Sequence, residues 1–405
     1  ILSLAVGLLF FTSPAVADRA PLQEAPITVK EASVTYTFGQ QAVFSIQATA
    51  SADIIALYLY LQSEGNERVE VTPVPITPGP SVQATFTRDL RLFPFPPFGT
   101  VRWWWEVRDA AGHQLTTPAS TFRYEDNRWD WFSRTVGPIT VHSTVDDPPY
   151  MQGALDIAAV SLERIARSLS VPPPERVDIY LYPSLADLQA ALRMAGREWM
   201  GGQARPELGA ILIAVPHHDG YLAQMEQEIP HELTHLFVYR LTGPGGYRYV
   251  PAWLNEGLAT ANETRPDPNL DSLLERARAE GRLIPLRNLC PPFSTDPAEA
   301  LLAYAESGSL VRYIRQRYGD STIRVLLLAY ADGADCEAGV QRALHVTLDQ
   351  LERAWRADLS GVGKWLVWMA DNAPGLALWG LSLLLAFPIA LAGLRSTRHG
   401  VQGSR

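Results

Sequence analysis

His231-Glu-Leu-Thr-His235 and Pro251-Ala-Trp-Leu-Asn-Glu-Gly-Leu-Ala259 are the two stretches of this 405-residue chain that decide its fold class. The first lies within residues 224–241, where the spacing of apolar side chains predicts a helix. Four residues span just over one helical turn, so both imidazoles project from one face and can bind the same metal ion. Glu232 stands one position further along, within reach of a water on that ion. A helix with ordinary surface histidines is the alternative for this first stretch alone.

The second stretch predicts a further helix and supplies a candidate for the third metal ligand, Glu256. Trp253, Leu254 and Leu258 surround this position with apolar side chains, so its carboxylate is expected to be buried. A buried carboxylate without a partner is costly, which favours a ligand over a side chain on a solvated face. Two histidines and one glutamate are a ligand set of catalytic zinc sites, which keep a fourth position open. We therefore expect one zinc ion per chain.

Together, the two motifs resemble those of the gluzincin zinc metallopeptidases. The first is similar to the thermolysin motif and the second to that of aminopeptidase N, and the most similar group is the peptidase MA-like family, some of whose members are bacterial membrane-anchored proteins. The resemblance covers residues 136–359. It implies that His231, His235 and Glu256 bind zinc and that Glu232 is the general base for attack of a zinc-bound water on a peptide carbonyl.

The resemblance also implies a role for Tyr304, in the segment Ala303-Tyr-Ala-Glu-Ser-Gly308: its hydroxyl stabilises the oxyanion. A tyrosine that only packs in the core is the alternative. Aminopeptidases of this type bind the substrate amine through the glutamate of a G-x-M-E-N segment. The corresponding strand, Gly209-Ala-Ile-Leu-Ile213, has no carboxylate, which favours an endopeptidase. We expect this strand to pair with an extended peptide.

The residues that support the ligands are not identified by this comparison. Tyr239 and Thr260 stand one turn beyond a ligand, where thermolysin relatives have aspartates.

Both ends of the chain carry membrane signals. Residues 1–17 are an apolar run that ends in Ala15-Val-Ala17, which predicts a cleaved signal peptide, with an uncleaved anchor as the alternative. Residues 373–394 carry no charged side chain and predict a transmembrane helix, with a buried core helix as the alternative. Arginines follow in the tail, residues 395–405, which places that tail in the cytoplasm and the catalytic domain outside. The predicted location is therefore the cell membrane, in a single pass.

Two further domains are expected between these signals. Residues 18–127 contain about seven short stretches of β-branched and aromatic residues separated by turn residues, typical of an immunoglobulin- or fibronectin-like sandwich. Residues 128–360 alternate strand and helix patterns before a helical C-terminal part, and residues 361–372 form a juxtamembrane linker. The predicted fold is thus multidomain: an all-β immunoglobulin-like sandwich, an α+β gluzincin catalytic domain and one transmembrane helix.

The two cysteines, the net charge and the absence of certain motifs bear on disulfide formation and on the partners of the chain. Cys290 and Cys336 lie in the exported region, where an oxidising compartment favours a disulfide over two free thiols. A net charge of -9 argues against nucleic acid as a partner. Neither phosphate-binding glycine motif is present, so no nucleotide is expected.

The sequence therefore predicts a membrane-anchored, extracytoplasmic zinc metallopeptidase that cleaves protein or peptide substrates in an extended conformation. Endopeptidase action is favoured over aminopeptidase action. The alternative from another class is a catalytically inactive, peptidase-like surface protein that serves binding or adhesion.

Overall fold

A computed structural model describes residues 26–66, 68–192 and 201–360. The predicted signal peptide, juxtamembrane linker, transmembrane helix and cytoplasmic tail all lie outside these residues. Within the described part of the chain, no helix combines the length and the apolarity needed to cross a membrane. The chain divides into two compact units, of which the first ends at Arg123 and the second begins with Pro96–Gly99 and continues from Tyr124.

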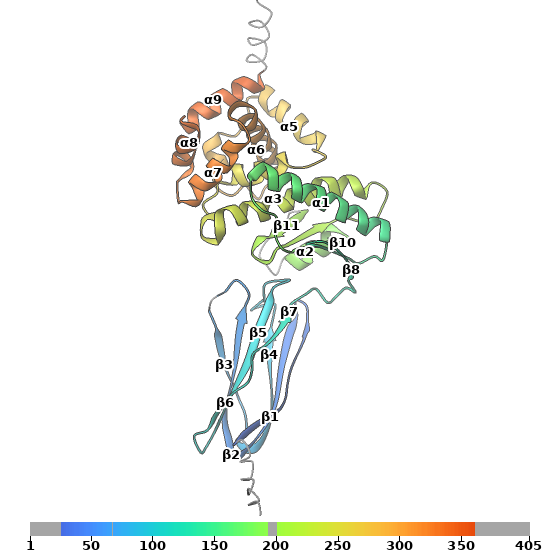
Figure 1. The fold of residues 1–405 in the computed structure, drawn as a ribbon, viewed down its shortest axis with the longest axis vertical. Helices are drawn as coiled ribbons and strands as arrows, with labels where there is room; N and C mark the ends of the chain where they lie inside the picture. The colour runs from blue at the N-terminus through green and yellow to red at the C-terminus, as the bar shows by residue number, and fades with distance from the viewer. Residues whose placement is uncertain (1–25, 67, 193–200, 361–405) are drawn as a thin grey trace, which may run out of the picture. The chain divides into compact units, whose positions relative to one another are not determined.

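The first unit is rich in β-strands (Figure 1). Its seven strands form one hydrogen-bonded network in which the long strand β2 is central. The first half of β2 pairs with β1 and β4, and its second half pairs with β3 and β5, after a register shift between Thr49 and Ile54. The strands are β1 (Ile27–Thr37), β2 (Gln41–Ser63), β3 (Glu70–Val74), β4 (Gly79–Asp89), β5 (Thr100–Asp109), β6 (Gln114–Thr116) and β7 (Ser120–Arg123).

Alternation of side chains builds the core of this unit. Phe44, Ile46 and Ala48 on β2 are buried, as are Trp103 and Trp105 on β5, because successive side chains of a strand point to opposite faces. The β-rich character agrees with the sequence prediction, whereas the immunoglobulin-like assignment stays a prediction.

The second unit combines a sheet with many helices. Its sheet has five strands in the order β11-β12-β10-β9-β8. The inner strands β12, β10 and β9 are parallel, and the edge strands β11 and β8 are antiparallel to their neighbours. The strands are β8 (Phe132–Val136), β9 (Ile139–Ser143), β10 (Val177–Tyr182), β11 (Gly202–Arg205) and β12 (Ala210–Ala214).

Helices α1 and α3 pack together, and α4 to α9 follow α3 along the chain (Figure 1). Helix α3 is kinked at Gly243, where φ is 71°. The helices are α1 (Pro148–Leu169), α2 (Leu185–Leu192), α3 (Tyr221–Tyr247), α4 (Ala252–Ala261), α5 (Pro268–Ala279), α6 (Pro297–Tyr318), α7 (Ser321–Ala331), α8 (Cys336–Leu344) and α9 (Leu348–Leu359), with short 3-10 turns η2 (Pro206–Leu208) and η3 (Leu286–Leu289).

One prediction about the sheet is wrong. The strand β12, expected to offer an open edge to a peptide, pairs with β10 on one side and with β11 on the other. All five of its residues are buried, which explains its continuous apolar sequence. Among the described residues, β11 is instead the last strand at this end of the sheet.

Glycines allow α4 and α6 to approach closely. A Cβ atom on Gly257 of α4 would lie 2.4 Å from the backbone oxygen of Ser307 on α6. A Cβ atom on Gly308 would likewise lie 2.8 Å from the Thr260 Cγ2 atom. This contact fixes the position of the helix that carries Glu256 against the helix that carries Tyr304.

Candidate metal and catalytic site

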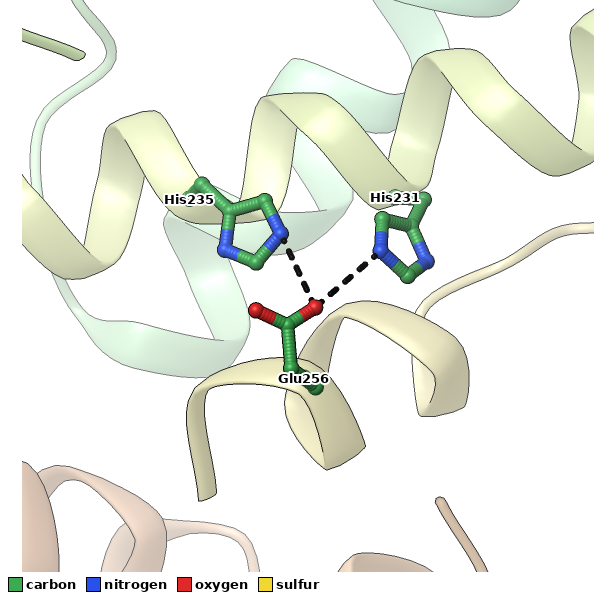
Figure 2. A group of neighbouring side chains, drawn as sticks. All are labelled: His231, His235 and Glu256. Carbon is green, nitrogen blue, oxygen red and sulfur yellow. Dashed lines mark ion pairs between the residues drawn. The ribbon is translucent and has the colours of Figure 1, made fainter. Parts of the chain in front are cut away.

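The structure brings the three predicted ligands together (Figure 2). His231 and His235 project from one face of α3, and Glu256 comes from α4. The Glu256 Oε2 atom lies 3.6 Å from His231 Nε2 and 3.5 Å from His235 Nε2. All three ligand atoms lie within 4.8 Å of one another.

These separations suit a metal ion. Zinc bonds of about 2.0–2.2 Å in a tetrahedral arrangement place neighbouring ligand atoms roughly 3.3–3.6 Å apart. The carboxylate-to-imidazole distances of 3.5 and 3.6 Å agree with that spacing. The donor set, two imidazole nitrogens and one carboxylate oxygen, is also chemically suited to zinc.

Each histidine is held by a further side chain through its other ring nitrogen. His231 Nδ1 lies 3.1 Å from the Glu263 Oε1 atom, and His235 Nδ1 lies 3.1 Å from the Asn255 Oδ1 atom. An acceptor at Nδ1 fixes the proton there and leaves Nε2 free to bind a cation. Neither partner was predicted from the sequence, and the Oγ1 atom of Thr260 has no hydrogen-bond partner among the described residues. Glu263 follows Glu256 in the sequence by the length of two helical turns. This spacing could have indicated that Glu263 lies near the metal ligands.

The surroundings of His231 favour positive charge. Burial lowers the pKa of its imidazole, but the carboxylates of Glu256 and Glu263 and the charge of Glu232 outweigh this effect. The net result is a pKa well above the usual value. A site that holds a proton so strongly also stabilises a cation in its place, which agrees with the ligand geometry.

Glu232, the predicted general base, is buried beside the edge strand. Burial raises the pKa of its carboxyl group to about 8, and the negative charges of Glu228 and Glu256 act in the same direction. The backbone N–H group of Ala204, on β11, donates a hydrogen bond to the carboxylate and opposes this rise. A bound cation would lower the pKa of Glu232. The carboxyl group would then be ionised at neutral pH and could accept a proton.

Tyr304 lies close to the ligands on helix α6. Its ring centroid is 6.1 Å from that of His231 and 5.2 Å from that of Phe293. Burial raises the pKa of its hydroxyl group, and the charges of Glu256 and Glu232 raise it further, so the group keeps its proton. It can therefore donate a hydrogen bond, as the predicted role requires.

A buried asparagine ties the surrounding helices together. Asn262, at the end of α4, donates from its amide to Thr234 Oγ1 on α3 at 3.1 Å and accepts from Arg315 on α6 at 3.0 Å. Its backbone oxygen accepts from Arg164 on α1. These bonds hold α4, and with it Glu256, in place.

A cavity of about 340 Å³ adjoins this cluster. His231, Glu232 and Tyr304 all line it, so the cavity opens onto the candidate site. Its other lining residues come from α3, from α4 and the segment after it, from the start of β11, and from α5 and α6.

The structure joins the other predicted pair, Cys290 and Cys336, by a disulfide. It connects the end of η3 with the start of α8, across 46 positions of sequence. A loop of that length corresponds to about 4 kcal/mol of stabilisation in the chain-entropy description.

The site thus defines a class of protein: one in which two histidines and a glutamate can hold a metal ion beside a buried glutamate. The sequence model of the peptidase MA superfamily matches residues 157–361, just over half of the chain. The chain belongs to the peptidase MA superfamily. No curated protein sequence matches it.

Three solved structures each resemble a small part of the chain. One described as a myokine structure shares 10% identity at a TM-score of 0.21, covering 25% of this chain and 99% of its own. Catalytically inactive OgpA from Akkermansia muciniphila, in complex with an O-glycopeptide substrate, shares 15% identity at a TM-score of 0.20. That match covers 25% of this chain and 30% of OgpA. The third fibronectin III domain of human KIAA0343 shares 10% identity at a TM-score of 0.19. That match covers 28% of this chain and 94% of the solved domain.

Proposed function

We propose that this protein is a zinc-dependent metallopeptidase of the gluzincin type that hydrolyses peptide bonds. The observation that carries the proposal is the convergence of His231, His235 and Glu256 on one point, with distances of 3.5 and 3.6 Å between carboxylate and imidazoles. The buried Glu232 beside this point supports it, as does membership of a peptidase superfamily.

Each residue has a defined task in this reaction. His231, His235 and Glu256 hold the ion, and Glu263 and Asn255 orient the two imidazoles. At this position a zinc ion would polarise the scissile carbonyl and make a bound water more acidic. Glu232 takes the proton of the attacking water and passes it to the leaving amine. Tyr304, which keeps its proton, donates a hydrogen bond to the oxyanion that develops on the carbonyl.

The edge strand β11 is the surface that suits an extended substrate. It is the last strand of the sheet, and Ala204 on it bonds to Glu232, so the strand runs along the catalytic carboxylate. A peptide paired with β11 would lie along the site in an extended conformation, as an internal segment of a protein substrate could. Like β12, this strand carries no carboxylate to bind a terminal amine.

We also propose that the chain is anchored in the cell membrane by residues 373–394, with its catalytic domain outside the cytoplasm. The support is the uncharged sequence of that segment and the arginines after it. The β-rich unit is proposed to be an immunoglobulin-like sandwich. Alkaline carbonate extraction of membranes tests the anchor, because an integral protein stays in the pellet and a peripheral one is released.

Glu232→Gln tests the catalytic proposal. We expect the variant to bind close to one zinc per chain, as the wild type does, while turnover falls by roughly 10²- to 10⁴-fold. Zinc content is measured by elemental analysis, and cleavage is mapped by mass spectrometry on a peptide library. Glu226→Gln is the matched control, because Glu226 lies on the same helix, pairs with Arg265 at 4.0 Å and does not line the cavity.

Three results would count against the proposal in different ways. Unchanged cleavage by Glu232→Gln would contradict its role as the base. Zinc binding without cleavage by the wild type would favour the alternative, an inactive protein that serves binding or adhesion. Removal of terminal residues only would overturn the endopeptidase assignment.

A further inference from the structure

We propose that the cavity beside the metal site is a specificity pocket for a positively charged nitrogen group of the substrate. The chemistry is shared by two sources, a lysine or arginine side chain and the free amino terminus of a peptide. This inference rests on the proposed peptidase function and names the substrate class of the same site.

Glu228 is the first carboxylate of this pocket. It stands on α3, three and four positions before His231 and Glu232, so all three share one helix face. It lines the cavity near the start of β11, where a Cβ atom on Gly201 would lie 3.3 Å from its Oε1 atom. None of the described residues forms an ion pair or hydrogen bond with its side chain. Glu228, on α3, thus supplies a carboxylate to the cavity, whereas the strands β11 and β12 carry none.

Glu263 and Thr260 add buried oxygen atoms without partners. The side chain of Glu263 is only 4% exposed, and while its Oε1 atom contacts His231, its Oε2 atom has no hydrogen-bond partner among the described residues. The Oγ1 atom of Thr260, a residue that is 4% exposed, likewise has no partner there. Both side chains line the cavity. Buried acceptors are expensive to leave unpaired, so a donor from a ligand would complete them.

The charge of the site favours a cation as this donor. Formal negative charges of Glu228, Glu232, Glu256, Glu263 and Asp267 outweigh the two positive charges of a zinc ion. No lysine or arginine is among the described residues that line the cavity. An ammonium or guanidinium group gains from this field, and a substrate carboxylate is repelled by it.

Part of the cavity wall is apolar. Leu270 of α5 and Pro297, Ala300 and Leu301 of α6 line it. An aliphatic stem can lie along such a wall while its charged end reaches the carboxylates, which is how lysine and arginine side chains are commonly accommodated. The volume of about 340 Å³ also exceeds what a single amino group occupies, so we assign the pocket to a basic side chain first.

A binding measurement tests this inference independently of catalysis. Fluorescent peptides are titrated, with anisotropy as the readout, against the full-length, zinc-loaded Glu232→Gln chain, which binds without turnover. One series is N-acetylated and carries arginine, citrulline, lysine or norleucine at one central position of otherwise identical peptides. The other contains no basic residue and compares a free with an acetylated amino terminus. We expect arginine to bind roughly tenfold to a hundredfold more tightly than citrulline, its neutral analogue.

Substitutions then locate the cation. Adding Glu228→Gln should bring the arginine-to-citrulline affinity ratio close to one, and adding Asp267→Asn should reduce this ratio less. Asparagine preserves the helix cap that Asp267 provides, so the Asp267→Asn variant should stay folded. Glu226→Gln, on the same helix outside the cavity, should leave the ratio unchanged. Thermal melting of each variant checks that the fold is intact.

The outcomes are distinct. A preference for the free amino terminus that Glu228→Gln removes would support the pocket and assign it to the terminal amine, making the enzyme an aminopeptidase. Equal affinity in both series overturns the inference, as does a preference that survives the combined Glu228→Gln and Asp267→Asn substitutions. Because binding is measured without turnover, these results hold even if no peptide is cleaved, which would count against the proposed function alone.

Discussion

Gly202 and Glu232 lie so close that no side chain fits between them: a Cβ atom built on Gly202 would be 2.6 Å from the Glu232 Oε1 atom and 3.0 Å from its Cγ atom. Gly202 begins the edge strand and Glu232 is the proposed base, so the strand's approach to the catalytic carboxylate depends on glycine. The contact involves the end of a side chain, which can move without unfolding the helix that carries it.

We therefore expect Gly202→Ala to displace the Glu232 carboxylate. A shift of about 1 Å at a reacting group can lower the rate by roughly 100-fold. The measurement is kcat/KM on a peptide that the wild type cleaves, together with zinc content, which should not change because none of the ligands is touched. Gly245→Ala is the control, since nothing lies within 4 Å of a Cβ atom there. Equal activity of Gly202→Ala and the wild type would show that the carboxylate adapts without cost.

The contact between Glu263 and His231 predicts an effect on metal affinity. Glu263→Gln keeps an oxygen that can accept from His231 Nδ1 but removes the charge that makes the imidazole a better ligand. Loss of such a supporting contact typically weakens metal binding 10- to 100-fold. Competition with a chromogenic chelator measures this change. Glu275→Gln, a substitution at a half-exposed carboxylate paired with Arg278, is the control and should bind zinc as the wild type does.

Sequence reasoning reached those parts of the site that helix geometry determines. His231 and His235 share a face because four residues span one turn, and the Glu256 side chain is only 18% exposed because its neighbours are apolar. The partners Asn255 and Glu263 were missed for a different reason. Their roles depend on the angle at which α4 meets α3, and this is set by contacts such as Asn262 with Thr234 that no local pattern reveals.

The edge strand could not be found for a related reason. The segment Gly202-Gln-Ala-Arg205 is short and has no β-branched or aromatic residue, so it carries no strand signal of its own. Its position depends on pairing with β12, whose apolar sequence suggested a strand but not which edge was open. The prediction therefore chose a strand that is already paired on both sides.

The contact between α4 and α6 predicts a more severe effect than the one at Gly202. In Gly257→Ala the new Cβ atom would meet the backbone oxygen and carbonyl carbon of Ser307, at 2.4 and 2.6 Å, and neither can rotate away. The helices must separate, which costs about 1–3 kcal/mol and moves Glu256 relative to the histidines. We expect a lower melting temperature and weaker zinc binding together. Melting and zinc affinity matching those of Gly245→Ala would contradict this account of the helix contact.

A buried carboxylate away from the metal site predicts a dependence of stability on pH. Glu306 on α6 is fully buried, and its Oε1 atom accepts from the backbone N–H of Ile284 at 2.9 Å. Its Oε2 atom has no partner among the described residues. Burial raises the pKa of Glu306 to about 7. The Ile284 hydrogen bond and the charge of Arg356 lower this pKa, but they offset only part of the effect of burial.

Because the folded-state pKa lies above the unfolded value of 4.5, the folded chain holds this proton more tightly. The stability from this group is therefore fully present below pH 4.5 and is lost as the pH rises through about 7. By pH 8 the loss amounts to about 3 kcal/mol. Glu306→Gln keeps the acceptor for Ile284 and cannot ionise, so its stability relative to the wild type should increase between pH 5 and pH 8. Urea unfolding at both pH values, with Glu275→Gln as the exposed control, measures this change. A difference between Glu306→Gln and the wild type that is the same at both pH values would show that Glu306 ionises as easily in the folded chain as in the unfolded one.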